Sequence, residues 1–413
     1  MKNFAIVGVG NYADNYIRII QKLEKEKIAN LFCAVVRDRE KNKKAVENLD
    51  YEGVVIYPSF EKMLTYGQGK IDIIALPIGG LDHFEYAKQA MEEGYDVVVE
   101  KPAAITIQDV NELQKLREKV DQYCIIGNEL LFSSSIGLLC NEIGSGRLGK
   151  LKSIKAKCAW PCGSDYFARN NWAGRLVVDG KWNLDGPATN HCASVLTSAL
   201  YLLQSACEPQ TEIESVQAEL YRAYDITSYD TVSMRVNMDN GTNVHFVSSY
   251  AVENEIEPVM EIICEDATIK WQANEEKTII RFNTGKKKIF RERQAETKFE
   301  SIFREAITVT TTRTRRPNSS IKTSRSHVLA LNLAFESAEE IVTIPNEFLA
   351  KSTLKGNKRI FMKDADSILA NAYENGKLFS ELDLPWAKAT TAYPANNYSN
   401  FPLNPKLKKL ISE

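Results

Sequence analysis

The tripeptide Glu100-Lys101-Pro102 is the segment of this 413-residue chain whose residue types and position point most clearly to chemistry. It follows Tyr95-Asp96-Val97-Val98-Val99, an apolar run that predicts a buried β-strand. Open α/β sheets bind their ligands outside the carboxyl ends of the strands. A lysine in that place can contact a substrate, so Lys101 is a candidate catalytic residue; a surface lysine paired with Glu100 is the alternative.

A glycine-rich turn near the start of the chain predicts a nucleotide site. Gly8-Val9-Gly10-Asn11-Tyr12-Ala13 fits the pattern G-x-G-x-x-[GA] between an apolar strand and an amphipathic helix. The first glycine permits a tight turn, the second lets the backbone approach a pyrophosphate, and the small third residue lets helix and strand pack closely. Phosphates then lie at the helix N-terminus. The predicted dinucleotide contacts are Gly8, Gly10, Asn11, Tyr12 and Ala13.

The end of the second predicted strand should read the ribose of the dinucleotide. An acid there binds the 2′-hydroxyl of NAD, whereas an arginine accommodates the 2′-phosphate of NADP. The chain has Arg37-Asp38-Arg39 at this position. Arg37 comes first, which favours NADP, and Asp38 keeps NAD open as the alternative.

A third loop follows the apolar strand that ends at Leu76-Pro77. It leads to His83, near the start of the next helix, where a histidine could cap the helix or orient the loop. We expect Leu76, Pro77, His83 and Glu100 to lie near the cofactor with Lys101, because parallel strands end at the same edge of a sheet.

Two kinds of pattern divide the chain. Residues 1–127 alternate apolar strands with helices, which is typical of a parallel sheet covered on both faces. After residue 128 the strands are longer and alternate in polarity, which predicts a largely antiparallel sheet. The predicted boundaries are 1–127, 128–345 and 346–413, with a helix at 327–341. We expect the basic loop at 312–316 to be a solvated surface loop, with contact to an anion as the alternative.

The composition excludes several classes of function. With 52 basic and 54 acidic residues the net charge is −2, so no overall charge favours nucleic acid or a membrane surface. No apolar stretch reaches the length of a membrane span. The cysteines are scattered; Cys158 and Cys162 are the closest pair, without a second pair at zinc spacing, so we predict no metal site. The chain begins directly with an apolar strand, and we expect a cytoplasmic protein with reduced thiols.

Four motifs occur in an informative order. They are Gly8–Ala13, Leu76-Pro77…His83, Glu100-Lys101-Pro102 and Gly146-Arg147-Leu148-Gly149-Lys150. Together they resemble the glucose–fructose oxidoreductase / inositol dehydrogenase / rhizopine-catabolism (Gfo/Idh/MocA) family of NAD(P)-dependent oxidoreductases, over at least residues 1–205. The resemblance implies an α/β protein with an N-terminal Rossmann domain and a C-terminal α/β domain built on a large, mostly antiparallel open sheet.

The resemblance also assigns roles to the parts. Residues 128–345 would bind substrate and form the oligomer interface of a homo-dimer or tetramer, and 346–413 would pack on the other domains or on a neighbouring subunit. Lys101 would contact substrate and nicotinamide ribose and assist proton transfer. We expect its pKa to fall beside an oxidised nicotinamide, because a buried ammonium loses stability there.

The second half of the site should come from the segment Asp185–His191, which we interpret as a helix start. Many members of the family carry an Asp and a His four residues apart on this helix. Here those positions hold Asn190 and Ser194 in one register, and Pro187 and His191 in the other, so the pair is missing in both. We predict that His191, with Asn190, takes over the catalytic role, and that Asp185 and Ser194 contact substrate. A helix-capping or partly buried His191 remains the alternative.

An aromatic and basic loop precedes this segment. Residues 165–175 include Arg169 and Trp172, which suit a polyol or sugar acid: the ring stacks on C–H faces, and a guanidinium binds a carboxylate through two hydrogen bonds. A packed structural loop is the alternative interpretation.

We therefore predict an NAD(P)-dependent oxidoreductase acting on a carbohydrate, polyol or sugar-acid hydroxyl, or on the matching ketone. The second hypothesis is a sensor or regulator that keeps the nucleotide site and has lost turnover. Dinucleotide binding without oxidation or reduction of any sugar would favour the sensor.

Overall fold

The computed structural model describes all residues except 11, 207–210, 274–276, 292–295, 315–316, 355 and 413. It divides into two compact units. The first comprises Met1–Phe132 and Ala295–Arg325, and the second comprises Ser133–Gln294 and Ser326–Glu413. The predicted boundaries do not include this return of the chain to the first unit after residue 294.

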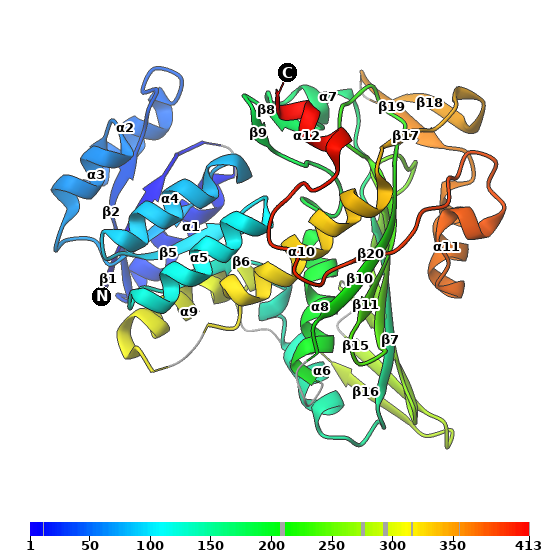
Figure 1. Ribbon diagram of the computed structural model, residues 1–413. Coiled ribbons are helices and arrows are strands. Elements are labelled where there is room, and N and C mark those ends of the chain that lie inside the picture. Colours follow the sequence, from blue (N-terminus) through cyan, green and yellow to red (C-terminus); the bar gives the residue numbers. More distant parts are fainter. Residues whose placement is uncertain are drawn as a thin grey trace. The chain divides into compact units, whose positions relative to one another are not determined.

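The first unit is built on a parallel sheet of six strands (Figure 1). The strands are β1 (Lys2–Val7), β2 (Ala29–Val35), β3 (Val55–Tyr57), β4 (Ile73–Leu76), β5 (Asp96–Glu100) and β6 (Cys124–Gly127). Their order, β3-β2-β1-β4-β5-β6, reverses direction between β1 and β4. Open sheets of this type bind ligands at such a switch point, beyond the carboxyl ends of the strands.

Helices cover both faces of this sheet. They are α1 (Ala13–Lys25), α2 (Lys43–Tyr51), α3 (Phe60–Gly67), α4 (Gly80–Glu92), α5 (Ile107–Lys119) and α9 (Lys298–Thr312), with the 3-10 helix η1 (Glu129–Phe132) after β6. α9 packs through an apolar stripe at helical spacing, and its Phe303 ring meets the rings of Phe4 and Tyr16 at centroid distances of 5.7 and 4.8 Å. The sequence prediction missed both α3 and α9.

The charged end of α9 is also tied to the sheet. The carboxylate of Asp96, at the start of β5, is buried and accepts hydrogen bonds from Thr310 Oγ1 at 2.5 Å and Arg313 Nη1 at 2.8 Å. A third bond comes from the backbone N–H of Tyr123 at 2.8 Å. Arg313, in the basic loop predicted at 312–316, directly follows the last residue of α9; its side chain is exposed, as predicted, and its guanidinium also pairs with this buried acid. Residues 315 and 316 of that loop lie outside the described residues.

The second unit contains a mixed, mostly antiparallel sheet of ten strands (Figure 1). They are β7 (Leu151–Ala159), β10 (Ile213–Arg222), β11 (Thr231–Met238), β12 (Asn243–Ser249), β13 (Ile256–Cys264), β14 (Ala267–Gln272), β15 (Lys277–Phe282), β16 (Lys287–Arg291), β17 (Val342–Thr343) and β20 (Tyr393–Pro394). The order is β16-β15-β14-β13-β7-β12-β11-β10-β17, and β20 pairs with β10. β7–β12 and β10–β17 are parallel; the other neighbours run antiparallel. The predicted fold class is therefore confirmed.

The helices of this unit are α6 (Ser134–Gly144), α7 (Ser164–Ala168), α8 (Ala193–Ala206), α10 (Ile321–Ala338, which begins in the first unit), α11 (Ala365–Asn375) and α12 (Pro405–Ser412). Smaller elements are β8 (Val177–Val178), β9 (Lys181–Trp182), β18 (Leu349–Leu354), β19 (Asn357–Met362), η2 (Asn346–Phe348) and η3 (Phe379–Leu382). α8 and α11 contact β12 from opposite faces, and nearly all of that strand is buried (Figure 1).

The C-terminal tail belongs to the second unit. Glu336 of α10 is buried and accepts hydrogen bonds from Tyr398 Oη at 2.7 Å and from the backbone N–H groups of Leu403 and Asn404 at 2.5 and 2.9 Å. These three bonds hold the segment that leads into α12. α10 begins at Ile321 and ends at Ala338, whereas the sequence predicted a helix at 327–341.

Candidate functional site

A pocket of about 330 Å³ in the first unit gathers half of the predicted dinucleotide contacts. Its lining includes Gly8, Gly10, Ala13, Arg37, Asp38 and Pro77. Gly8 has φ +90°, a conformation that favours glycine. A Cβ on Gly10 would stand 3.0 Å from Asn42 Oδ1. The turn therefore has the shape that the glycine pattern predicts, and Asn11 lies outside the described residues.

The end of β2 presents both a cation and an acid to this pocket. The Arg37 guanidinium lies 5.5 Å from the ring centroid of Tyr86, which also lines the pocket. Asp38 Oδ1 accepts the backbone N–H of Lys41 at 2.9 Å, so this oxygen caps the turn. Arg39, by contrast, donates to the carbonyl oxygen of Ile56 at 3.0 Å.

Lys101 lies directly beyond β5, between two carboxylates. Its Nζ is 3.3 Å from Glu129 Oε2 and 3.8 Å from Glu100 Oε2, and only 15% of its side chain is exposed. Burial lowers the pKa of Lys101, but Glu129 and Glu100 outweigh burial, so its pKa is raised. The expected fall considered only a nicotinamide. In the structure the two carboxylates raise the pKa of Lys101 by more than burial lowers it, so the ammonium stays charged.

Glu100 is held in place by hydroxyl groups of the first helix. Its Oε1 accepts hydrogen bonds from Tyr16 Oη and, at 3.3 Å, from Tyr12 Oη. The neighbouring strand leaves no room for movement, because a Cβ on Gly127 would stand 2.7 Å from Glu100 Oε1 and 3.0 Å from Tyr16 Oη. Tyr12, predicted as a cofactor contact, therefore has a described role in fixing Glu100.

His83 connects two loops at the carboxyl edge of the sheet. Its ring is buried, with Nδ1 2.7 Å from the carbonyl oxygen of Pro102 and Nε2 3.0 Å from that of Ile78. Burial lowers the pKa of His83, which favours the neutral ring. The residue thus orients the loop after β4 and the loop that follows Lys101. Leu76 is buried at the end of β4.

Sequence reasoning missed two residues at the end of β6. Glu129 pairs with Lys101, and Asn128 is buried with an Oδ1 to which the described residues give no hydrogen-bond partner. The signal was present, since Gly127-Asn128-Glu129 ends a predicted strand next in order to the one that carries Lys101. In the structure β5 and β6 are parallel neighbours, with Glu100 opposite Gly127.

The second unit carries an aromatic cluster around His191. The imidazole stacks on the ring of Trp160 at a centroid distance of 5.6 Å, and both side chains are exposed. Buried Tyr250 donates its hydroxyl proton to the carbonyl oxygen of Gly186 at 3.2 Å. The same hydroxyl oxygen lies 3.2 Å from His191 Nδ1 and 3.3 Å from its backbone N–H. Since the one hydroxyl proton is used, Nδ1–H donates, and in the neutral ring Nε2 is the acceptor.

Asn190 and Asp185 brace the turn that presents His191. Asn190 Nδ2 donates to Asp185 Oδ1 at 3.1 Å and to Tyr166 Oη at 3.3 Å. Asp185 Oδ2 accepts the backbone N–H of Gly174 at 2.7 Å, and burial raises the pKa of this acid. The predicted helix start is wrong by several residues, because α8 begins only at Ala193. Backbone turns after Gly186 come first, and Ser194 is buried.

Arg169 lies exposed in the same cluster. Its guanidinium is 3.6 Å from the ring centroid of Tyr166 and 5.0 Å from that of Trp172. Stacking on two rings holds a planar cation with its N–H edges available to a planar anion. The structure thus brings Arg169, Trp172, Asn190 and His191 together through Tyr166, a residue that was not among the predicted contacts.

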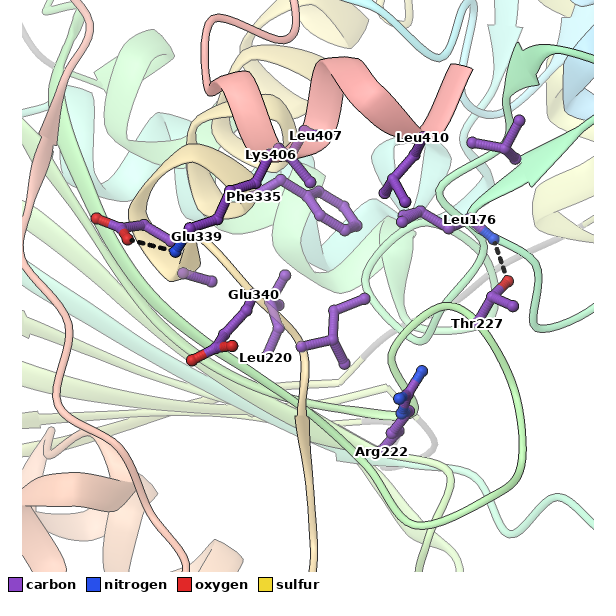
Figure 2. A pocket seen from close by; sticks show the side chains of 13 residues that line it. Leu176, Leu220, Arg222, Thr227, Phe335, Glu339, Glu340, Lys406, Leu407 and Leu410 are labelled. Atoms are coloured by element: carbon purple, nitrogen blue, oxygen red, sulfur yellow. Dashed lines mark hydrogen bonds and ion pairs between the residues drawn. The ribbon is translucent and has the colours of Figure 1, made fainter. Parts of the chain in front are cut away.

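A separate apolar pocket of about 490 Å³ lies beneath α12 in the second unit (Figure 2). Phe335, Leu407 and Leu410 form part of its wall, and Lys406 pairs with Glu339 at its edge at 3.6 Å. None of the predicted site residues lines it. Among the described residues there is no group of acids, cysteines and histidines suited to hold a metal ion. None of the helices they form combines the length and apolar character needed to cross a membrane.

Comparison with known proteins supports the dinucleotide site. Residues 2–128 match the family model GFO_IDH_MocA, described as an oxidoreductase family with an NAD-binding Rossmann fold. The oxidoreductase YfiI of Bacillus subtilis is 21% identical over 245 residues, which are 57% of this chain and 60% of that protein. The alignment therefore spans less than two thirds of that relative.

Two solved structures share the fold over more of the chain. An inositol dehydrogenase homologue from Azotobacter vinelandii, complexed with NAD+, has a TM-score of 0.70 at 14% identity and covers 82% of this chain and 95% of that chain. The WlbA dehydrogenase of Bordetella pertussis, in complex with NADH and UDP-GlcNAcA, has a TM-score of 0.65 at 19% identity, covering 82% and 96%. The predicted resemblance to the Gfo/Idh/MocA oxidoreductases is therefore confirmed, through residues 2–128, which match the family model with its NAD-binding Rossmann fold.

Proposed function

We propose that this protein is an NAD(P)-dependent dehydrogenase or reductase that acts on a hydroxyl, or the matching ketone, of a carbohydrate, polyol or sugar acid. The observation that carries the proposal is the placement of Lys101. A largely buried ammonium lies at the carboxyl end of β5, in the same unit as the glycine turn, and two carboxylates hold it. Proton transfer to or from a substrate oxygen requires such a group.

The residues of the first unit fit a dinucleotide. The turn at Gly8 and Gly10 would receive the pyrophosphate, and the pocket that they line also contains Arg37 and Asp38 for the ribose. The unpartnered Oδ1 of Asn128 suits an amide N–H such as that of a nicotinamide carboxamide. When bound, the nicotinamide would supply the hydride acceptor or donor. NADP is the proposed preference, because Arg37 and Lys41 both line the pocket.

The cluster of the second unit suits a sugar. The exposed Trp160 ring offers an apolar face, and His191 offers an acceptor whose tautomer Tyr250 fixes. Arg169, stacked on Tyr166, provides a cation for a carboxylate or phosphate of the substrate. A relative crystallised with a sugar acid, UDP-GlcNAcA, supports this substrate class without identifying the substrate.

The test replaces Lys101 and follows the absorbance of the reduced nicotinamide with panels of polyols, sugars and sugar acids. Lys101→Ala should lower kcat by at least roughly 10²-fold while dinucleotide affinity changes little. Lys88→Ala is the matched control, because Lys88 pairs with Glu112 at 2.6 Å on the surface of the same unit. Near-normal turnover by Lys101→Ala would refute the role of this lysine.

Two further results bear on the proposal. Dinucleotide binding by the wild type without turnover of any panel member would favour the sensor hypothesis. Failure to bind either NAD(H) or NADP(H) would refute both. The homo-dimer or tetramer and the cytoplasmic location stay predictions, and light scattering of the purified chain would test the first.

A further inference from the structure

The two carboxylates beside Lys101 differ in how they are held. Glu100 Oε1 is fixed by the hydroxyls of Tyr12 and Tyr16, and the backbone at Gly127 closes the space beside it. Its other oxygen is 3.8 Å from Lys101 Nζ, which is beyond good hydrogen-bond distance. Glu100 is therefore a fixed carboxyl group near the lysine, and burial raises its pKa.

Glu129 makes the closer contact. Its Oε2 is 3.3 Å from Lys101 Nζ, and its side chain is 20% exposed, against 9% for that of Glu100. It comes from a different element, the first residue of η1, so it approaches Lys101 from the neighbouring strand end. The ammonium of Lys101 thus lies between a carboxylate of β5 and a carboxylate of the segment after β6.

We propose that Glu129 is the positioning residue of this site, which holds Lys101 in its protonated form and fixes the direction of its N–H groups. The inference rests on the proposed function, because it assigns Lys101 the work of donating a proton. It adds Glu129, a residue of the first unit whose proposed role does not depend on Asn190 or His191. A lysine that starts as an ammonium suits reduction of a ketone, in which the substrate oxygen must gain a proton.

Among the described residues of the first unit, Tyr12 and Tyr16, in the turn and first helix after β1, lie beside Glu100, and His83 on α4 lies near Lys101. Burial raises the pKa of both tyrosines and lowers the pKa of His83, so all three are neutral near pH 7. α9, which packs on η1 and α1, turns the aromatic side chains of Phe299 and Phe303 toward the two tyrosines.

The ionisation of Lys101 can be measured without turnover. Acetic anhydride acetylates only the neutral amine, so the rate of labelling of the Lys101 peptide, followed by mass spectrometry against pH, reports its protonation. The chain denatured in urea gives the reference rate for the same peptide. In the wild type, Lys101 should label more slowly than in the denatured chain throughout the alkaline range.

Glu129→Gln keeps the shape of the side chain and removes its charge. Labelling of Lys101 at about pH 9 should become roughly tenfold faster, since an opposite charge within hydrogen-bond reach is worth a pKa change of about one unit or more. Glu129→Asp should restore part of the protection. Glu112→Gln is the matched control: it removes the partner of Lys88 and should leave Lys101 unchanged.

An unchanged labelling rate in Glu129→Gln, with Glu129→Asp equal to it, would overturn the proposal. If Glu129→Gln does not fold, the wild-type titration decides: a Lys101 that labels as fast as in the denatured chain would overturn it. A failure of the proposed function would be seen in a different measurement, the turnover assay. A Lys101→Ala variant that still turns over would refute the catalytic role, while the labelling shift would stand.

Discussion

Replacing His245 with glutamine should remove a large part of the acid sensitivity of the second unit. His245 lies on β12, and its Nε2 donates to the carbonyl oxygen of Lys377 at 2.9 Å. Its Nδ1 is buried, and the described residues give it no partner. Burial lowers the pKa of His245 to about 4, and nearby Arg235 adds to the effect, whereas Glu381 opposes it.

The sign follows from proton binding. A histidine in the unfolded chain has a pKa of about 6.5, so between about pH 6.5 and pH 4 the unfolded state binds a proton that the folded state does not. The neutral His245 therefore contributes its full share to the free energy of unfolding above the unfolded pKa, and this contribution is lost as the pH falls toward about 4. From about pH 7.5 to about pH 5 the loss is about 2 kcal/mol. For a unit of this size that corresponds to about 4 to 8 °C in Tm.

The chain offers a probe that reports on the second unit alone. All five tryptophans, Trp160, Trp172, Trp182, Trp271 and Trp386, belong to that unit, so tryptophan fluorescence follows its unfolding. Between the two pH values the wild type should lose about 2 kcal/mol more than His245→Gln, whose amide can still donate to Lys377. His191→Gln removes an exposed histidine and should behave like the wild type. Equal losses in the wild type and His245→Gln would refute the argument that a buried neutral histidine sets this sensitivity.

Three further predictions concern the first unit. Arg37→Gln should weaken NADPH binding at least about tenfold with little effect on NADH, measured by nicotinamide fluorescence; equal effects would refute 2′-phosphate recognition. Asp96→Asn should destabilise the first unit by about 2 kcal/mol, because it weakens the buried hydrogen bonds to α9. Urea unfolding followed by far-UV circular dichroism measures this loss. Arg313→Gln should cost less, since that side chain is 36% exposed. Gly127→Ala should cost about 1 to 3 kcal/mol and reduce turnover, because its Cβ would stand 2.7 Å from Glu100 Oε1; unchanged stability would mean that the strand relaxes freely.

Local patterns predicted much of the fold. The apolar runs of the first 127 residues became the parallel strands near their predicted places, because strands covered on both faces need continuous apolar sequence. α9 was missed, although Thr297 and Glu300 form a helix start in which Thr297 Oγ1 accepts the N–H of Glu300 at 3.1 Å. Its membership of the first unit depends on contacts with residues some 200 to 300 positions earlier, such as Asp96 and Tyr16, which no local pattern encodes.

Site residues in strand-end motifs were easier to predict than those whose role depends on packing. The glycine turn, Arg37 and Pro77 come together in one pocket because each follows its own strand to the same edge of the sheet. Tyr250 could not be recognised as the partner of His191, because it lies 59 positions later, directly after β12, and the register of that strand decides where its hydroxyl lies.

The sequence lacks the Asp/His pair that the family resemblance leads one to expect in the second unit. Lys101 nevertheless has ionic partners in the first unit. Two glutamates of its own unit, Glu100 and Glu129, already flank it. Of the two, Glu129 makes the closer contact and supplies the charge that keeps Lys101 an ammonium. On this argument, Glu129→Gln should lower kcat for the reduction of a ketone while dinucleotide affinity changes little. An unchanged kcat in this variant would show that Lys101 does not depend on the charge of Glu129.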